Sequence, residues 1–255
     1  MQPKIIGTTL PVVEIGLDAG DKIVAEPGQF SWMTENVQLN TTTQTAGAKG
    51  LMGVLGRAMG GGGIFMTEFV APQGNGMVAF SAQVPGQIVQ IDVSPGHGYM
   101  IHRSGFLCAT EGVELSMGFQ KSLGAGIFGG NGFVLQKLAG TCTAWIELGG
   151  EIVTYDLKAG ESIQAHPGHV GMFQDTVQFD IRMLKGIKNV LFGGDGLFVA
   201  NLTGPGTVWM QSLTLPTLAH ALQPYIQVEV NKDATTAGVA GGVAAGVMKG
   251  LFGGK

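Results

Sequence analysis

The chain is short of charged residues. Asp, Glu, Lys and Arg make up 13% of its 255 residues, and the formal net charge is −4. A nucleic-acid-binding surface needs clustered Lys and Arg, so this composition argues against nucleic acid as a partner. A surface with few charges is also prone to association, which predicts that part of it is buried between subunits or against an apolar partner.

Two further absences narrow the class of protein. The chain has only two cysteines, Cys108 and Cys142, and both lie in apolar stretches. We therefore predict buried thiols, since a disulfide would require the two residues to be adjacent in the fold. Residues 1–4 lack the basic and apolar regions of an export signal, which predicts a cytoplasmic protein.

What the chain does contain is 44 glycines and one pattern that occurs three times. In each copy an alternating apolar strand ends at a turn glycine, at Gly20, Gly96 and Gly160. The first copy is longer because it carries an insertion between Thr41 and Gly63. Self-similarity at this period indicates tandem structural units.

Within each copy the pattern predicts β-structure. Runs such as residues 22–25 and 106–109 alternate with period two between Gly, Pro and Asn, and no long amphipathic helix interrupts them. A unit of about 65 residues is marginal by itself, so the units must support one another. We expect an all-β fold of three β repeats, residues 1–86, 87–149 and 150–214. Residues 215–255 then form a short helix, from near Pro216 to before Pro224, that docks on the β body, and a glycine-rich tail.

Several short motifs carry a resemblance to a known family. They comprise the strand at 153–157, the Pro-Gly turns at 27–28 and 167–168, the glycine-rich stretches at 128–133 and 192–198, and the segments 215–219 and 224–226. With these motifs, the chain between Pro11 and Ile226 resembles the family named after Altered Inheritance of Mitochondria protein twenty-four.

The resemblance implies a fold more specifically than it implies a function. It implies three tandem short double-stranded β-helix domains like those of the trp RNA-binding attenuation protein (TRAP-like), and homotrimers that close a ring of nine pseudo-equivalent domains. No catalytic residues come with it. Its mitochondrial members are similar to inner-membrane-associated factors that support cristae-organising complexes.

A metal or cofactor site was weighed against the repeat geometry. Glu26, His102 and His166 each follow a turn glycine by six residues, and His169 lies near the last of them. The repeats assign the first three residues to different domains, whereas one metal ion needs ligands at about 2.2 Å, so no metal is predicted. Residues 124–129 match the dinucleotide fingerprint only formally, because their neighbours are strands. We predict no cofactor and no catalytic residue.

Apolar segments that carry cations link the hairpins of every repeat, a composition typical of interfacial amphipathic elements. The alternative is that these connectors cap the barrel ends or form the trimer contact. The residues that we expect to contact a membrane or a partner are Leu51, Met52, Leu55, Met59, Lys121, Leu123, Ile127, Phe128, Leu184, Lys185, Ile187, Lys188, Leu191 and Phe192.

The tail repeats glycine every four residues. As a helix it would form Gly-x-x-x-Gly contacts for self-association through Gly238, Gly242, Gly246 and Gly250. Such a helix would be about 25 Å long, shorter than a hydrocarbon core of about 30 Å, and Lys249 interrupts it, so no transmembrane span is predicted. The alternative is a flexible glycine-rich tail.

These observations predict a non-enzymatic, ring-forming homotrimeric scaffold. We expect it in the cytoplasm, peripheral to the inner membrane when its apolar elements bind a membrane surface or a membrane-bound protein. One alternative is a single-stranded RNA-binding ring, which would need basic grooves with stacking aromatics. The other is a small-molecule-binding or metal-binding β-helix protein with its site at the domain mouths.

Overall fold

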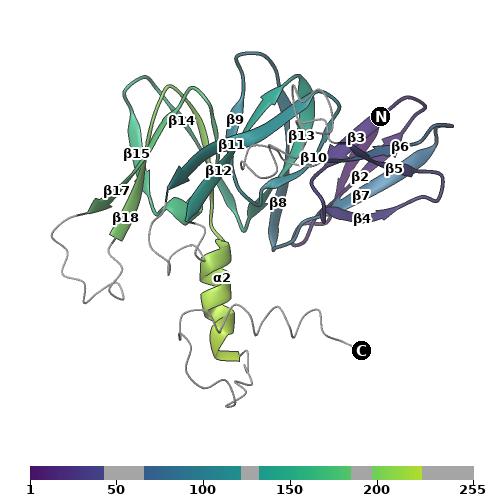
Figure 1. Ribbon diagram of the computed structural model, residues 1–255. Coiled ribbons are helices and arrows are strands. Elements are labelled where there is room, and N and C mark those ends of the chain that lie inside the picture. Colours follow the sequence, from purple (N-terminus) through teal and green to yellow (C-terminus); the bar gives the residue numbers. More distant parts are fainter. Residues whose placement is uncertain (43–65, 122–131, 185–196, 226–255) are drawn as a thin grey trace, which may run out of the picture. The chain divides into compact units, whose positions relative to one another are not determined.

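The computed structural model describes residues 1–42, 66–121, 132–184 and 197–225 (Figure 1). Within these ranges the chain is nearly all β, with one short α-helix near the C-terminal end, and the predicted all-β class is confirmed. Residues Met1–Pro216 form one compact unit and Thr217–Lys255 a second. The helix α2 (Leu215–Leu222) continues into the 3-10 turn η3 (Gln223–Tyr225), close to its predicted bounds. Its docking on the β body stays a prediction.

After an N-terminal strand β1 (Gln2–Ile6), six strands recur three times in the same order. The first repeat contains β2 (Val12–Leu17), β3 (Lys22–Ala25), β4 (Phe30–Met33), β5 (Gln38–Thr42), β6 (Met66–Val70) and β7 (Gly76–Ser81). The second contains β8 (Gly86–Val93), β9 (Tyr99–His102), β10 (Phe106–Thr110), β11 (Val113–Lys121), β12 (Phe133–Gly140) and β13 (Cys142–Gly149). The third contains β14 (Ile152–Leu157), β15 (Ser162–Ala165), β16 (Val170–Gln174), β17 (Gln178–Leu184), β18 (Leu197–Thr203) and β19 (Gly206–Gln211), with a 3-10 turn η1 (Pro167–His169) before β16.

Every repeat has the same pairing scheme. In the first repeat, β2, β7 and β4 form one antiparallel sheet, and β5, β6 and β3 form another. Alternate residues of both sheets point into the space between them, where Ile15 of β2 and Phe69 of β6 share one core. The second and third repeats have the same arrangement, with β8-β13-β10 and β14-β19-β16 as their first sheets.

The three predicted turn glycines share a backbone conformation. Gly20, Gly96 and Gly160 have φ angles of +94°, +79° and +84°. A Cβ at any of them would meet no atom within 4 Å, so space does not require glycine there. Glycine is favoured there by the left-handed backbone conformation, which ends the first strand of each repeat at the same place.

A β-bulge also recurs in every repeat. The register shifts at Ser31 in β4, at Leu107 in β10 and at Gly171 in β16. Directly after it, the two residues that face each other across the strands are Trp32 and Ala79, Cys108 and Trp145, and Met172 and Trp209. Each repeat therefore places one tryptophan at this position, but the first repeat places it on the opposite strand.

Both cysteines are buried and free, as predicted. Cys108 faces Trp145 in the core, and burial raises its pKa well above the ordinary value for a thiol. Burial also raises the pKa of Cys142, to about 11. Both thiols therefore stay protonated at neutral pH and contribute to packing.

Candidate assembly surface

The repeats are joined through continuous sheets. β3 of the first repeat pairs with β10 of the second, and β9 of the second repeat pairs with β16 of the third, both antiparallel. The registers match as well, because Val24 faces Ala109 in one junction and Met100 faces Phe173 at the equivalent positions of the other. The results are two six-stranded sheets that each span two repeats, one with β5 and β8 as its edges and the other with β11 and β14 (Figure 1).

Side chains cross each junction into the core of the preceding repeat. We call the three cores first, second and third, after the repeat that encloses them. The first core takes in Ile88, Leu107, Cys108 and Trp145 from the second repeat. The second core takes in Met172, and Ile152 and Trp209 pack against it from the third repeat. Each of these two cores is thus completed by the repeat that follows.

Ion pairs also cross the junctions. Lys22 Nζ lies 3.3 Å from Glu111 Oε1 across the first junction. Lys137 Nζ lies 3.4 Å from Asp175 Oδ2 across the second. Glu111 and Asp175 occupy equivalent positions, just after β10 and β16. Solvent screens both pairs, so each stabilises its junction only weakly.

At each junction a buried polar side chain accepts hydrogen bonds from the backbone segment that connects the two repeats. Glu147 Oε1 accepts hydrogen bonds from the backbone amides of Gln83 and Val84, both at 2.9 Å. Glu147 is 2% exposed, and its Oε2 has no hydrogen-bond partner within the described part of the chain. Burial raises the pKa of this carboxyl. In the third repeat the equivalent residue is Gln211, whose Oε1 accepts from the Gly149 amide and whose Nε2 donates to the Gly168 carbonyl.

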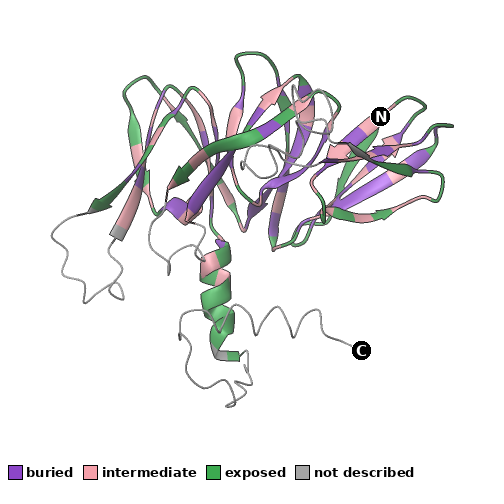
Figure 2. Ribbon diagram, in the orientation of Figure 1, coloured by how far each residue is buried: buried purple, intermediate pink, exposed green. Residues whose placement is uncertain are grey.

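Two of the described edge strands, β4 and β15, have equivalents that are paired on both sides at the repeat junctions. β4 is a sheet edge, whereas its equivalents β10 and β16 are interior strands. β15 is also a sheet edge, whereas its equivalents β3 and β9 are interior strands. The first four residues of β10 and of β16 are all buried, but β4 and β15 contain no buried residue (Figure 2). Trp32 on β4 is 43% exposed.

The third core is also open on one side. On β14, Val153 and Tyr155 are 49% and 42% exposed. Their equivalents in the first repeat, Val13 and Ile15, are fully buried, although the residues are similarly apolar. The described residues contain no further repeat that covers the third core as the second repeat covers the first.

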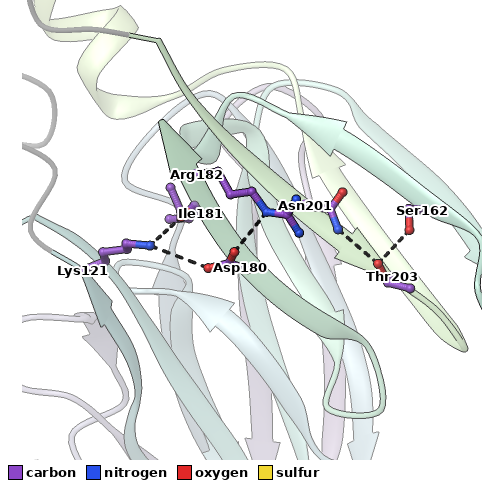
Figure 3. Close-up of polar contacts among 7 residues, drawn as sticks. All are labelled: Lys121, Ser162, Asp180, Ile181, Arg182, Asn201 and Thr203. Carbon is purple, nitrogen blue, oxygen red and sulfur yellow. Dashed lines mark hydrogen bonds and ion pairs between the residues drawn. The ribbon is translucent and has the colours of Figure 1, made fainter. Parts of the chain in front are cut away.

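Polar side chains gather beside the free edge of β15 (Figure 3). Ser162 Oγ and Thr203 Oγ1 are 2.7 Å apart, and Asn201 Nδ2 donates to the same threonine oxygen at 3.1 Å. One strand further on, Arg182 Nε donates to Asp180 Oδ2 at 3.3 Å. The edge strand therefore carries neutral hydrogen-bonding groups, with charged groups further from the edge.

Lys121 is the one predicted contact residue whose side chain the described ranges include. Its ammonium group donates to the Ile181 carbonyl and lies 3.6 Å from Asp180 Oδ1, so it ties β11 to β17 (Figure 3). Leu184 ends β17, but its side chain is outside the described set. The other predicted membrane, partner and tail residues lie outside the described residues: Leu51, Met52, Leu55, Met59, Leu123, Ile127, Phe128, Lys185, Ile187, Lys188, Leu191, Phe192, Gly238, Gly242, Gly246 and Gly250.

The four residues weighed as metal ligands have separate partners. Glu26 accepts a hydrogen bond from Gln136 Nε2 at 3.0 Å, and His102 Nε2 lies 2.9 Å from the Glu147 carbonyl oxygen. The rings of His166 and His169 are 5.9 Å apart between centroids. Across the described part of the chain, no three His, Cys, Asp or Glu side chains are grouped to hold a metal ion. Burial is the largest cause of the raised pKa of Glu26 and of the lowered pKa values of His102 and His166.

The described helices include none that is long and apolar enough to cross a membrane.

Comparison with known proteins gives relatives of the same fold. An uncharacterized protein of Streptococcus pyogenes serotype M6 is 28% identical over 225 residues, which are 87% of this chain and 89% of the relative. An X-ray crystal structure of a Streptococcus pyogenes protein superposes with a TM-score of 0.69 at 26% identity and covers 88% of this chain and 99% of that one. The family profile described as Mitochondrial biogenesis AIM24 matches residues 4–213. Since this match spans most of the chain, the protein belongs to the Mitochondrial biogenesis AIM24 family.

Proposed function

We propose that this chain is a non-enzymatic scaffold that closes into a homotrimeric ring, with β15 of one copy paired to β4 of the next. The observation that carries the proposal is which strands form the two edges in question, β15 and β4. β15 is the equivalent of β3 and β9, and β4 is the equivalent of β10 and β16, the strands that pair in both internal junctions. β4 and β15 are therefore the two halves of a junction that forms twice among the described strands.

The two free edges differ, so the proposed contact is heterologous. A heterologous contact that repeats with rotation generates a closed ring or an open filament. The family resemblance supports three copies and a closed ring. Extending the internal register places Gln164 opposite Met33 and Ile163 opposite Thr34 of the next copy.

Backbone hydrogen bonding identifies the position at which to test the edge. The Gly204 amide donates to the Glu161 carbonyl at 2.9 Å, so the C=O of Glu161 points toward β18. Backbone groups alternate along a strand, so those of Ile163 also point toward β18 and those of Gln164 point away from it. The Gln164 amide is therefore free to donate to a β4 strand.

Proline at this position removes only the outward donor. We expect the wild-type protein to have the native mass of three chains in light scattering, and Gln164→Pro to be a folded monomer, because Pro is tolerated on an edge strand whose N–H faces solvent. The matched control is Gln164→Ala, which loses the same side chain but keeps the amide, and it should remain trimeric. A monomeric wild type, or a trimeric Gln164→Pro, would contradict the ring.

The scaffold proposal includes binding of a membrane surface or of a membrane-bound partner. Its support is the apolar and cationic composition of the connectors, such as residues 185–192, and the description of the family by mitochondrial biogenesis. We expect the trimer to float with vesicles that contain anionic lipid and to remain unbound with neutral vesicles. Equal recovery of protein from the two floated fractions would count against an electrostatic membrane contact.

A further inference from the structure

We propose that Trp32 of one copy completes the open third core of the neighbouring copy, where it covers Val153 and Tyr155. This inference rests on the ring proposed above and adds the side chain that anchors its contact. The occupant to which we commit is a second copy of this chain.

The positions of the three tryptophans support this assignment. Trp145 is 1% exposed and belongs to the first core, which the first repeat encloses. Trp209 packs against the second core in the same way. Trp32 is at the equivalent cross-strand pair, so it points in the equivalent direction, toward a preceding repeat. Among the described residues no repeat lies on that side of β4, and Trp32 is 43% exposed.

In the first repeat the tryptophan lies on the other strand of the cross-strand pair, and this position fits a contact at the sheet edge. In the second and third repeats the tryptophan is on β13 or β19, one strand inward from the junction. In the first repeat Ala79 takes that place, and the indole is on β4, the edge strand itself. Both residues of a directly opposed pair lie on the same face of the sheet, so the indole stays on the face that covers the preceding core.

The third core lacks the cover that such a residue supplies. Five apolar positions of the first repeat, on β2 and β3, are at most 1% exposed: Val13, Ile15, Leu17, Ile23 and Ala25. Their equivalents in the third repeat are all at least partly exposed: Val153, Tyr155, Leu157, Ile163 and Ala165. The apolar surface that the first core buries under the second repeat is thus left open at the other end of the chain.

Polar groups at the two edges are also compatible. Glu35 follows β4 at the position of Glu111 and Asp175, and it is exposed. In the internal junctions this acid meets Lys22 or Lys137. Across the proposed contact, the equivalents of these two lysines are Ser162 and Asn201, which carry hydroxyl and amide donors (Figure 3). The acid would therefore meet hydrogen-bond donors and no carboxylate.

Two measurements on the full-length chain test the inference. Hydroxyl-radical footprinting read by mass spectrometry should find Trp32 at least five-fold less oxidised in the wild type than in the Gln164→Pro variant. Trp32→Ala should weaken assembly by at least roughly 30-fold in sedimentation equilibrium, the effect of losing a hot-spot aromatic residue. Its circular dichroism spectrum should match that of Gln164→Pro. The matched control is Met183→Ala, since Met183 is 53% exposed on β17 and outside the proposed contact.

The outcomes separate the inference from the ring itself. The ring and the Trp32 anchor are both supported if the wild type is trimeric with Trp32 protected, and if Trp32→Ala weakens assembly but Met183→Ala does not. A trimeric wild type in which Trp32 is oxidised as in the monomer, or in which Trp32→Ala assembles normally, overturns the anchor and leaves the ring intact. A wild type that is monomeric at all concentrations overturns the ring and the anchor together.

Discussion

The middle repeat and the outer repeats have the same strand order and differ in what covers them. β10 of the second repeat lies between β3 and β13, and four of its five residues are buried. β4 of the first repeat has the same place in its sheet and an aromatic-rich sequence, yet it has no buried residue. The comparison teaches that burial at these positions depends on the adjacent repeat more than on the hydrophobicity of the strand.

The same comparison applies to the two sheet faces at the ends of the β body. β2 buries every second residue because the second repeat closes its core, whereas β14 leaves four consecutive residues exposed. An exposed edge that carries apolar residues invites pairing with another chain. A protein with so few charges has little other means to oppose this association, so the open ends are the features that most require a partner.

The largest expected effect comes from breaking an internal junction. Trp145→Ala should destabilise the chain by about 3–5 kcal/mol, because it removes a fully buried aromatic side chain and leaves a cavity in the first core. For a chain of this size, thermal denaturation should show a midpoint lowered by roughly 10 °C.

Trp32→Ala is the matched control, since it truncates the equivalent residue at the open end. In the Gln164→Pro background it should cost less than about 1 kcal/mol, because Trp32 is already 43% exposed in the single chain. Equal destabilisation by the two tryptophan substitutions would mean that the first-repeat edge is as closely packed as the interior junction.

A smaller effect is expected at the buried carboxyl of the first junction. Burial raises the pKa of folded Glu147 above the value of 4.5 for a free glutamate. Its contribution to stability is therefore fully present below about pH 4.5 and is lost as the pH rises through the folded pKa. Glu147→Gln keeps the acceptor for Gln83 and Val84 and removes the charge, so it should stabilise the chain at pH 8 by about 1 kcal/mol.

The measurement is urea denaturation of the wild type and Glu147→Gln at pH 5 and pH 8. The difference between the two proteins should grow with pH. The contribution of Glu26 to stability also falls as the pH rises, because burial raises its pKa too, whereas that of buried His102, whose pKa burial lowers, falls as the pH drops. Both residues are present in the two proteins, so their contributions cancel in the difference. A stability difference that is constant across this range would show that Glu147 does not change its ionisation between pH 5 and pH 8.

The smallest effect should come from making the open edge more like the internal ones. Ser162→Lys places a cation at the position of Lys22, where it can approach Glu35 of the next copy. We expect assembly to strengthen by about 0.2–1 kcal/mol at low salt and the gain to fall at high salt. Ser162→Gln, an uncharged long side chain, is the control, and a gain equal to that of the lysine would assign the effect to packing.

The sequence predicted the repeat period and the β class well because both depend on local chemistry. Alternating apolar residues and glycines with positive φ, such as Gly20, determine where each strand lies and ends. The buried free thiols followed from the apolar runs around them.

The assembly surface could not be predicted from the same patterns. Trp32, Val153 and Tyr155 were not among the expected contact residues, because a strand at an open edge and one in an interior position have the same alternation. One clue was present: Ala79 stands where the other repeats have Trp145 and Trp209, which leaves Trp32 as the tryptophan of the first repeat. The sequence alone does not show that Trp32 faces Ala79, because this cross-strand pairing is set by the tertiary structure.

By itself the sequence determined three β repeats, their turn glycines and an apolar composition that requires burial, since these follow from backbone preferences and side-chain polarity within short segments. Only the tertiary structure decided which strands pair between repeats and which edges remain open. Pairing partners such as Val24 and Ala109 are far apart in the chain and are selected by the completion of a shared core.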